Sequence, residues 1–594
     1  MRPMKRTLAL AIAGTLLASC GHKDKDAPLA FVPADTPYVV ANLDVLDDDT
    51  RKALLAQADA QLPTEVAQLR TAASEMAAKD PDSARLLNAV AAELDGQTIE
   101  AFAQRAGLNM KGYSALYGLG LAPVLRFQLS DPKAFEAFIG RLETAYGKKF
   151  DVATVGGQSY RKHVSSEAGT EVIVAVVGKQ AVAAVLPADA SEPLLRQALG
   201  LDRPAKNLQD DGRLEKLAKA NDYQKWAVGQ LDLTRALPLA AGGKDPLFSA
   251  MMKAHAMAES ARTGEPVANQ MQIPASCETD AARIAARVPG ASFGYTALDA
   301  KHQDMRVDIA LADDITAAFS APKVDMPGLG TPGTAPFDFT LALPVAQLRT
   351  FWMAQADAVA AKPFTCPQLA DLNDGFAKLG PSLQKAAIPP FGDLLGLRIA
   401  LDSFSADKHA AMPSFTGRLV VGTSNHAGLL AMGQMLTPAL AQLKVSADGK
   451  PVALPANLSS ILGQPAWLAM GAKALALGIG ADEAPKLTEA LQAPTGEPGR
   501  MLRMHLSGDM YLSWITLMQD KADSFTAAAA AMTKGTGANP ADPAQEPADK
   551  AASAALSKNQ FDAMRAQAAR IKAIDAEAHV DRHAMVITSQ TELK

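Results

Sequence analysis

Residues 176–199 read VVGKQAVAAVLPADASEPLLRQAL, and this stretch decides the fold that the sequence predicts. Two apolar runs flank a tight turn at Gly178-Lys179, so we expect two antiparallel strands joined as a hairpin. Ala-Asp then precedes a run with apolar residues at helical spacing, which predicts a capped helix. Residues 469–491, AMGAKALALGIGADEAPKLTEAL, show the same order of strand, turn, strand, cap and helix.

Further segments of the chain repeat in the same order. The corresponding segments are 36–60 with 334–358, 124–142 with 418–436, 154–160 with 446–452, 226–237 with 501–512, and 292–311 with 574–593. Ordered self-similarity of this kind indicates an internal duplication. We therefore predict an α+β protein of two homologous halves, each an antiparallel sheet with helices packed on one face.

The predicted halves are residues 31–325 and 337–594. Between them, residues 326–336 read MPGLGTPGTAP, whose proline and glycine content is typical of a linker.

Two segments depart from the repeated pattern. Residues 50–107 are rich in Ala, Leu, Gln and Glu, which predicts a helical hairpin broken at Asp80-Pro81-Asp82. Residues 533–549 read TKGTGANPADPAQEPAD, a composition that predicts a disordered loop.

The first twenty residues combine a basic start with a short apolar run. Arg2, Lys5 and Arg6 precede the uncharged run 7–18, the pattern of a secretory signal peptide. The run ends in Leu-Ala-Ser and Cys20, which resembles the lipobox of bacterial lipoproteins. The resemblance implies that residues 1–19 are a removed signal peptide and that Cys20 carries a diacylglycerol, usually within a set of three acyl chains. The alternative is an ordinary signal peptide with a chance cysteine.

The same resemblance implies a place in the cell envelope. In such lipoproteins an aspartate directly after the lipidated cysteine favours retention in the inner membrane. This chain has Gly21 at that position, which favours export to the outer membrane. The periplasmic side of that membrane is preferred over the cell surface. Residues 20–30 then form a polar tether. The segment from Pro33 to Tyr38, PADTPY, resembles the start of the mature domain in large uncharacterised Gram-negative lipoproteins, a resemblance that implies no particular activity.

Charge and cysteine content limit the partners and the compartment. The formal net charge of −5 becomes −8 when the three basic residues of the signal peptide are removed (−5 − 3 = −8), and no basic run is present to bind nucleic acid. With Cys20 lipidated, Cys277 and Cys366 remain, and two cysteines in an oxidising compartment predict a disulfide bond.

No catalytic motif is recognisable. The chain contains no H-E-x-x-H, and Gly178-Lys179 lies in a hairpin turn without the spacing of a phosphate-binding loop. No cofactor is expected, and no metal is favoured. The weak metal candidates are His579, Asp581 and His583, which would share one face if they formed a strand.

Two functional hypotheses follow. The first is a non-enzymatic, lipid-anchored envelope protein that binds a hydrophobic, peptide or protein ligand or acts as a scaffold. The alternative is an envelope hydrolase whose active site is assembled from scattered residues at the interface of the two halves.

Overall fold

The computed structural model describes residues 25–78, 80–165, 167–264, 266–267, 273–331, 333–386, 388–405, 414–520 and 561–594. The expected signal peptide, Cys20 and the expected loop at 533–549 lie outside these ranges. The chain divides into two compact units. Unit 1 extends to Ala300 and includes Met305–Ala310, whereas unit 2 comprises Lys301–Asp304 and the described chain from Leu311 onward.

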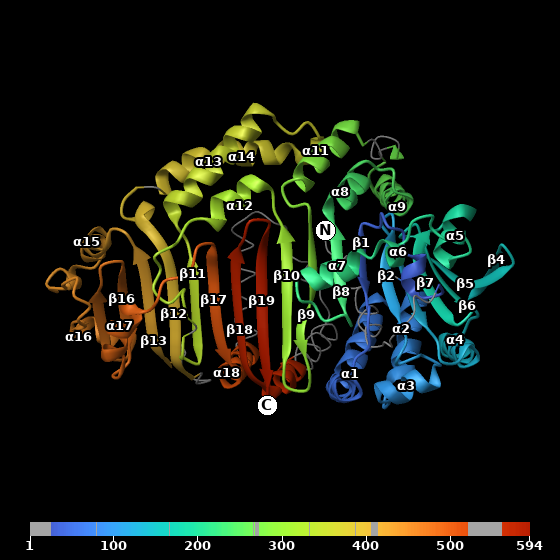
Figure 1. The fold of residues 1–594 in the computed structure, drawn as a ribbon, viewed down its shortest axis with the longest axis horizontal. Helices are drawn as coiled ribbons and strands as arrows, with labels where there is room; N and C mark the ends of the chain where they lie inside the picture. Colours follow the sequence, from blue (N-terminus) through green and yellow to red (C-terminus); the bar gives the residue numbers. More distant parts are fainter. Residues whose placement is uncertain are drawn as a thin grey trace. The chain divides into compact units, whose positions relative to one another are not determined.

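Unit 1 is built on an antiparallel sheet with the strand order β10–β9–β8–β1–β2–β3–β7–β6–β5–β4 (Figure 1). The first strand lies inside the sheet, where Val39 pairs with Tyr117 of β2 and with Gln230 of β8. The strands are β1 (Tyr38–Ala41), β2 (Ser114–Leu119), β3 (Ala122–Gln128), β4 (Asp151–Val155), β5 (Gln158–Ser165), β6 (Thr170–Val177), β7 (Gln180–Pro187), β8 (Val228–Asp232), β9 (Gly290–Leu298) and β10 (Gln303–Ala310).

The helices of unit 1 begin at polar caps that the sequence supplies. Before α4, Asp131 accepts hydrogen bonds from the backbone amides of Lys133 and Ala134, and Gly147 ends the helix with φ of 80°. The helices are η2 (Pro28–Phe31), α1 (Asp48–Met76), α2 (Pro81–Leu94), α3 (Ile99–Arg105), α4 (Pro132–Tyr146), α5 (Glu192–Leu199), α6 (Leu208–Asp211), α7 (Arg213–Ala220), α8 (Leu233–Ala241), α9 (Pro246–Thr263) and α11 (Ala275–Ala285).

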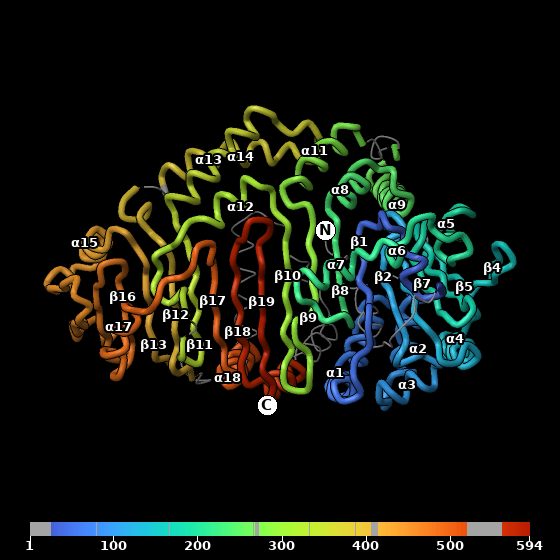
Figure 2. The backbone as a smooth tube through the Cα atoms, in the orientation of Figure 1, coloured from blue at the N-terminus to red at the C-terminus, as the bar shows by residue number. Residues whose placement is uncertain are grey.

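The segment between β1 and β2 is helical, and its path runs in blue in Figure 2. The break between α1 and α2 lies at the Asp-Pro-Asp sequence where the hairpin was expected to turn. Asp80 caps α2 by accepting a hydrogen bond from the amide of Ser83, and Pro81 occupies the first helical position. The local sequence therefore determines where this helical stretch divides.

Helices cover both faces of the sheet in unit 1, so the expectation of helices on one face is wrong for this unit. Neighbouring residues of a strand point to opposite faces. Ala181 of β7 packs in a cluster with Phe135 of α4, whereas Val182 packs in another with Leu199 of α5 and Leu214 of α7. The cause is that β7 is apolar at consecutive positions, so each face needs its own cover.

Unit 2 has the strand order β19–β18–β17–β11–β12–β13–β16–β15–β14, again antiparallel. This order matches that of unit 1 from β10 to β5, strand for strand, and β4 has no counterpart among the described strands. The strands are β11 (Phe337–Ala342), β12 (Leu394–Ser405), β13 (Ser414–Thr423), β14 (Val452–Ala453), β15 (Ala466–Met470), β16 (Ala474–Ile479), β17 (Arg500–Ser507), β18 (Ile571–Val580) and β19 (Ala584–Leu593).

The helices of unit 2 occur at corresponding places between the strands. Thus α15 follows β13 as α4 follows β3, and α17 follows β16 as α5 follows β7. The helices are α12 (Asp313–Ser320), α13 (Val345–Ala361), η3 (Pro367–Leu369), α14 (Ala370–Ala386), η4 (Phe391–Asp393), α15 (His426–Leu436), η5 (Pro438–Leu440), α16 (Ala456–Leu462), α17 (Glu483–Gln492) and α18 (Gly508–Asp520). No helix in the described part of the chain combines the length and apolar character needed to cross a bilayer.

The segment 326–336 belongs to the core of unit 2, which corrects its expected role as a linker and moves the boundary between the units to about residue 310. Met326 and Leu329 are fully buried and pack with Val420 and Leu487. The backbone amides of the two neighbouring glycines, at 328 and 330, donate to the carbonyl of Pro494. Proline and glycine here allow an irregular buried path rather than a flexible one.

Replacing Met326 with alanine tests this assignment. We expect Met326→Ala to lower the free energy of unfolding by about 2–5 kcal/mol, because it removes a fully buried side chain and leaves a cavity. Met435→Ala is the matched control, since Met435 is 83% exposed and should change stability by less than about 0.5 kcal/mol. Urea unfolding followed by tryptophan fluorescence measures both. Equal, small effects would mean that residues 326–336 are a linker after all.

Candidate functional site

The cysteines that the sequence pairs are joined in the structure. Cys277 and Cys366 are disulfide-bonded, and their side chains are 3% and 4% exposed. Cys277 lies in the first turn of α11, and Cys366 immediately precedes η3. Both cysteines therefore lie where helices begin.

The weak metal candidates do not share a strand face, which corrects the expected arrangement. Since β18 ends at Val580 and β19 begins at Ala584, Asp581 and His583 lie in the turn between them, away from His579 on β18. Asp581 Oδ1 accepts hydrogen bonds from the amides of His583 and Ala584, both at 2.7 Å, so this carboxylate closes the hairpin. Within the described ranges, no three His, Cys, Asp or Glu side chains are grouped so that they could hold a metal ion.

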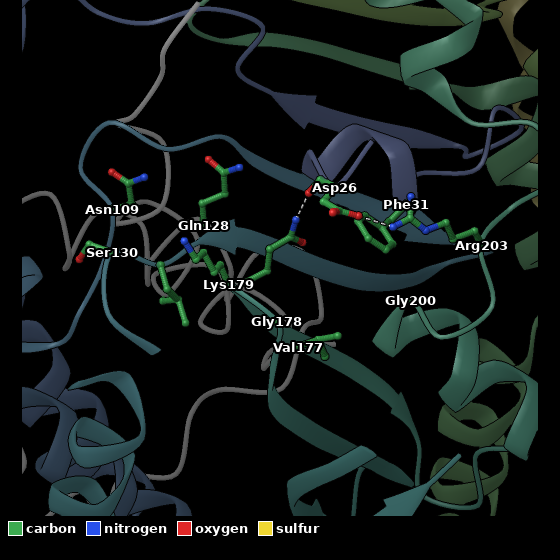
Figure 3. Close-up of a pocket in the computed structure, with 12 residues that line it drawn as sticks. Asp26, Phe31, Asn109, Gln128, Ser130, Val177, Gly178, Lys179, Gly200 and Arg203 are labelled. Atoms are coloured by element: carbon green, nitrogen blue, oxygen red, sulfur yellow. Dashed lines mark hydrogen bonds and ion pairs between the residues drawn. The ribbon is translucent and has the colours of Figure 1, made fainter. Parts of the chain in front are cut away.

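A pocket of about 750 Å³ lies within unit 1, at one end of strands β3 and β7 (Figure 3). Figure 3 shows Asp26, Phe31 and Arg203 together on one side and Asn109, Gln128 and Ser130 on the other, with Lys179 between them. The remaining lining residues are Leu129, Val177, Gly178, Gln180 and Gly200. The volume is within the usual range of small-molecule sites, and the lining is more polar than is usual for them.

Phe31 forms the apolar floor on one side of the pocket. Two guanidinium groups lie close to its ring, with Arg126 Cζ at 4.0 Å and Arg203 Cζ at 4.5 Å from the ring centroid. Arg203 forms an ion pair with Asp26, which fixes the start of the described chain against the pocket. Each cation–ring contact is favourable because the ring faces carry partial negative charge, and it offsets part of the repulsion between the two arginines.

Arg126 is a fully buried cation behind this floor. Its guanidinium donates to Gln180 Oε1 at 3.0 Å and to the carbonyl of Ala198 at 3.2 Å. Burial lowers the pKa of Arg126, and the nearby Tyr117 hydroxyl partly opposes this effect. Gly200, with φ of 76°, lets the guanidinium approach, since a Cβ there would lie 2.5 Å from Arg126 Nη2. The positive charge is thus built into unit 1 next to the pocket.

A second charged cluster lies in unit 2, between strands β12 and β13 and helix α17. Arg418 Nη1 contacts Asp402 at 2.9 Å and Glu483 at 3.0 Å, and Lys486 contacts the same two carboxylates. The cations and hydrogen bonds lower the pKa of Asp402 to about 2, whereas burial raises the pKa of Glu483. The side chains of Arg418 and Glu483 are 8% and 2% exposed, so this cluster joins the helix to the sheet rather than meeting a substrate.

Comparisons with known proteins give no relative: no family model matches the chain, and no curated protein or solved structure is similar to it. The pocket is therefore assessed on its own geometry.

The pocket was not predictable from sequence motifs. From sequence, Gly178-Lys179 is only a hairpin turn, which describes the backbone correctly because β6 ends at Val177 and β7 begins at Gln180. The one feature of the sequence that pointed to the pocket was a lysine in the turn between two apolar strands. Its neighbours in the pocket come from distant parts of the chain, so no local pattern could indicate them.

The charged cluster of unit 2 should make stability depend on pH. The pKa of Asp402 in the folded state lies below its ordinary value of 3.8, so its stabilising effect is complete above about pH 4 and is lost as pH falls toward 2. We expect Asp402→Asn to lower the free energy of unfolding by about 1 kcal/mol at pH 7, and this difference should shrink at about pH 3.

Urea unfolding at the two pH values measures the effect. The control is Asp374→Asn, at an exposed position of α14, which should show little difference at either pH. A loss of stability in Asp402→Asn that stays the same at pH 7 and pH 3 would contradict the assignment.

Proposed function

We propose that this protein is a non-enzymatic, lipid-anchored binding or scaffolding protein of the bacterial cell envelope. In this proposal a diacylglycerol on Cys20 holds the protein at the periplasmic side of the outer membrane. The observation that carries the proposal is the bond between Cys277 and Cys366, because structural disulfides persist in oxidising compartments. The lipobox resemblance of residues 17–20 supplies the means of export and attachment.

The proposal includes an internal duplication of the folded part of the chain. Three observations support it: the shared strand order, the corresponding positions of the helices and the equal spacing of paired residues. Val124 pairs with Ala184, and Arg418 pairs with Gly478, each residue 294 positions further along (418 − 124 and 478 − 184). Two copies of a unit can diverge, so that one copy takes a ligand while the other keeps a structural role.

Replacing Cys20 tests the anchor. We expect Cys20→Ser to abolish labelling by a radioactive fatty acid and to remove the acyl mass from the N-terminal peptide, because the serine hydroxyl cannot form the thioether. Mass spectrometry of the protein from isolated envelopes measures the second effect. Cys277→Ser is the control variant that should keep its label. Continued labelling of Cys20→Ser would refute the anchor.

Reduction tests the compartment argument. We expect the natural protein taken from envelopes to contain no titratable thiol under denaturing conditions, and to migrate more slowly on a gel after reduction. Breaking the bond, by reduction or by Cys366→Ser, should lower stability by up to about 4.5 kcal/mol in the chain-entropy treatment of a loop of this length. Two reactive thiols in the natural protein would contradict an oxidising location.

A further inference from the structure

Lys179 is a cation at the pocket of unit 1 that has no protein partner among the described residues. It lies at the tip of the turn between β6 and β7, and its exposed side chain makes no hydrogen bond or ion pair with any described residue. The acidic residue of the described lining, Asp26, is paired with Arg203 instead. Because Arg126 also lies behind Phe31, the pocket carries an excess of positive charge.

The corresponding lysine of unit 2 is neutralised. The amide of Leu129 donates to the carbonyl of Lys179 at 2.8 Å, and the amide of Thr423 donates to the carbonyl of Lys473 at 2.8 Å. The two lysines therefore occupy the same place between equivalent strands. Lys473 Nζ contacts Asp325 Oδ2 at 2.5 Å, so unit 2 supplies its own carboxylate where unit 1 supplies none.

The polar side chains around Lys179 present donors to the pocket. Gln128 Oε1 accepts from the amide of Tyr113, and Asn109 Oδ1 accepts from the amide of Lys111. These bonds use the side-chain oxygens of Gln128 and Asn109, so their NH₂ groups remain as donors in the pocket that Lys179 also lines (Figure 3). A ligand that meets an ammonium and two amide donors needs several acceptor oxygens and a negative charge, which a phosphate group provides.

The position of the pocket favours a phosphate that belongs to a lipid. Asp26 follows Cys20 by six residues, a length of chain that spans at most about 20 Å. If Cys20 is lipidated, the pocket stays close to the headgroup layer of the membrane. Phe31, Leu129 and Val177 give the lining an apolar part that suits the glycerol end of a phospholipid.

We propose that the pocket of unit 1 binds the glycerophosphate headgroup of an anionic phospholipid, with Lys179, Gln128 and Asn109 contacting the phosphate. This inference rests on the proposed lipid anchor and deepens it, because headgroup binding would orient the protein on the membrane that the anchor selects. In this proposal the ammonium group of Lys179 attracts the phosphate as a point charge. The side-chain amides of Gln128 and Asn109 fix the orientation of the phosphate.

The test uses the full chain extracted from envelopes in a neutral detergent. Short-chain dihexanoylphosphatidylglycerol is titrated into the protein by calorimetry, alongside dihexanoylphosphatidylcholine and free glycerol 3-phosphate. We expect phosphatidylglycerol to bind the natural protein most tightly and Lys179→Gln to bind it at least about fivefold more weakly. Lys179→Arg should keep the affinity within about twofold. Lys473→Gln is the matched control and should bind like the natural protein, since Lys473 is already paired.

Two results would overturn the proposal or part of it. Equal affinities of the Lys179→Gln and Lys473→Gln variants for phosphatidylglycerol would overturn the site. Glycerol 3-phosphate binding as tightly as phosphatidylglycerol would overturn the lipid in favour of a soluble phosphate ester. Intact mass of the same samples reports the acyl chains on Cys20, so a failed anchor is distinguished from a failed pocket.

Discussion

The requirement that β7 be covered on both faces shapes unit 1. Its residues are apolar at consecutive positions, so Ala181 and Val182 each need a buried partner on opposite sides of the sheet. Helix α4 covers Ala181 on one face, and helices α5 and α7 cover Val182 on the other. This packing fixes β7, the strand that follows the Gly178-Lys179 turn. The turn therefore lies at the end of the sheet, beside the segment that contains Asp26 and Phe31. The pocket exists because those two segments meet there.

Buried charges are handled differently in the two units. In unit 2, Arg398 forms a two-point ion pair with Asp338, and Arg418 is shared by two carboxylates. In unit 1, Arg126 donates to an amide oxygen and a carbonyl and lies over an aromatic ring, while its buried Nε atom has no hydrogen-bond partner and no acid is paired with it. Burying a charge is costly unless its hydrogen bonds are met, so a cation without an acid partner leaves positive potential around it. Phe31 and Gln180, which contact Arg126, both line the pocket.

The contrast between Lys179 and Lys473 would give the proposed duplication a functional meaning. The same turn position carries a lysine in both units, and only the lysine of unit 2 has a carboxylate beside it. Asp26, the acidic residue of the described pocket lining, pairs with Arg203 rather than with Lys179. A ligand phosphate would then replace, in unit 1, the negative charge that unit 2 carries in its own chain.

The sequence by itself determined the strand, turn and helix elements and their repeated order, because apolar periodicity and polar caps such as Asp80 and Asp131 act over a few residues. It also indicated which cysteines pair, since few alternatives existed. Only the tertiary structure decided that both faces of the sheet in unit 1 are covered, that Met326 and Leu329 are core, and that Lys179 lines the same pocket as Asn109 and Gln128. These outcomes depend on contacts between residues far apart in the chain, and Asp26 with Arg203 is the clearest case. Local patterns carry no record of which distant partner will fill a face or neutralise a charge.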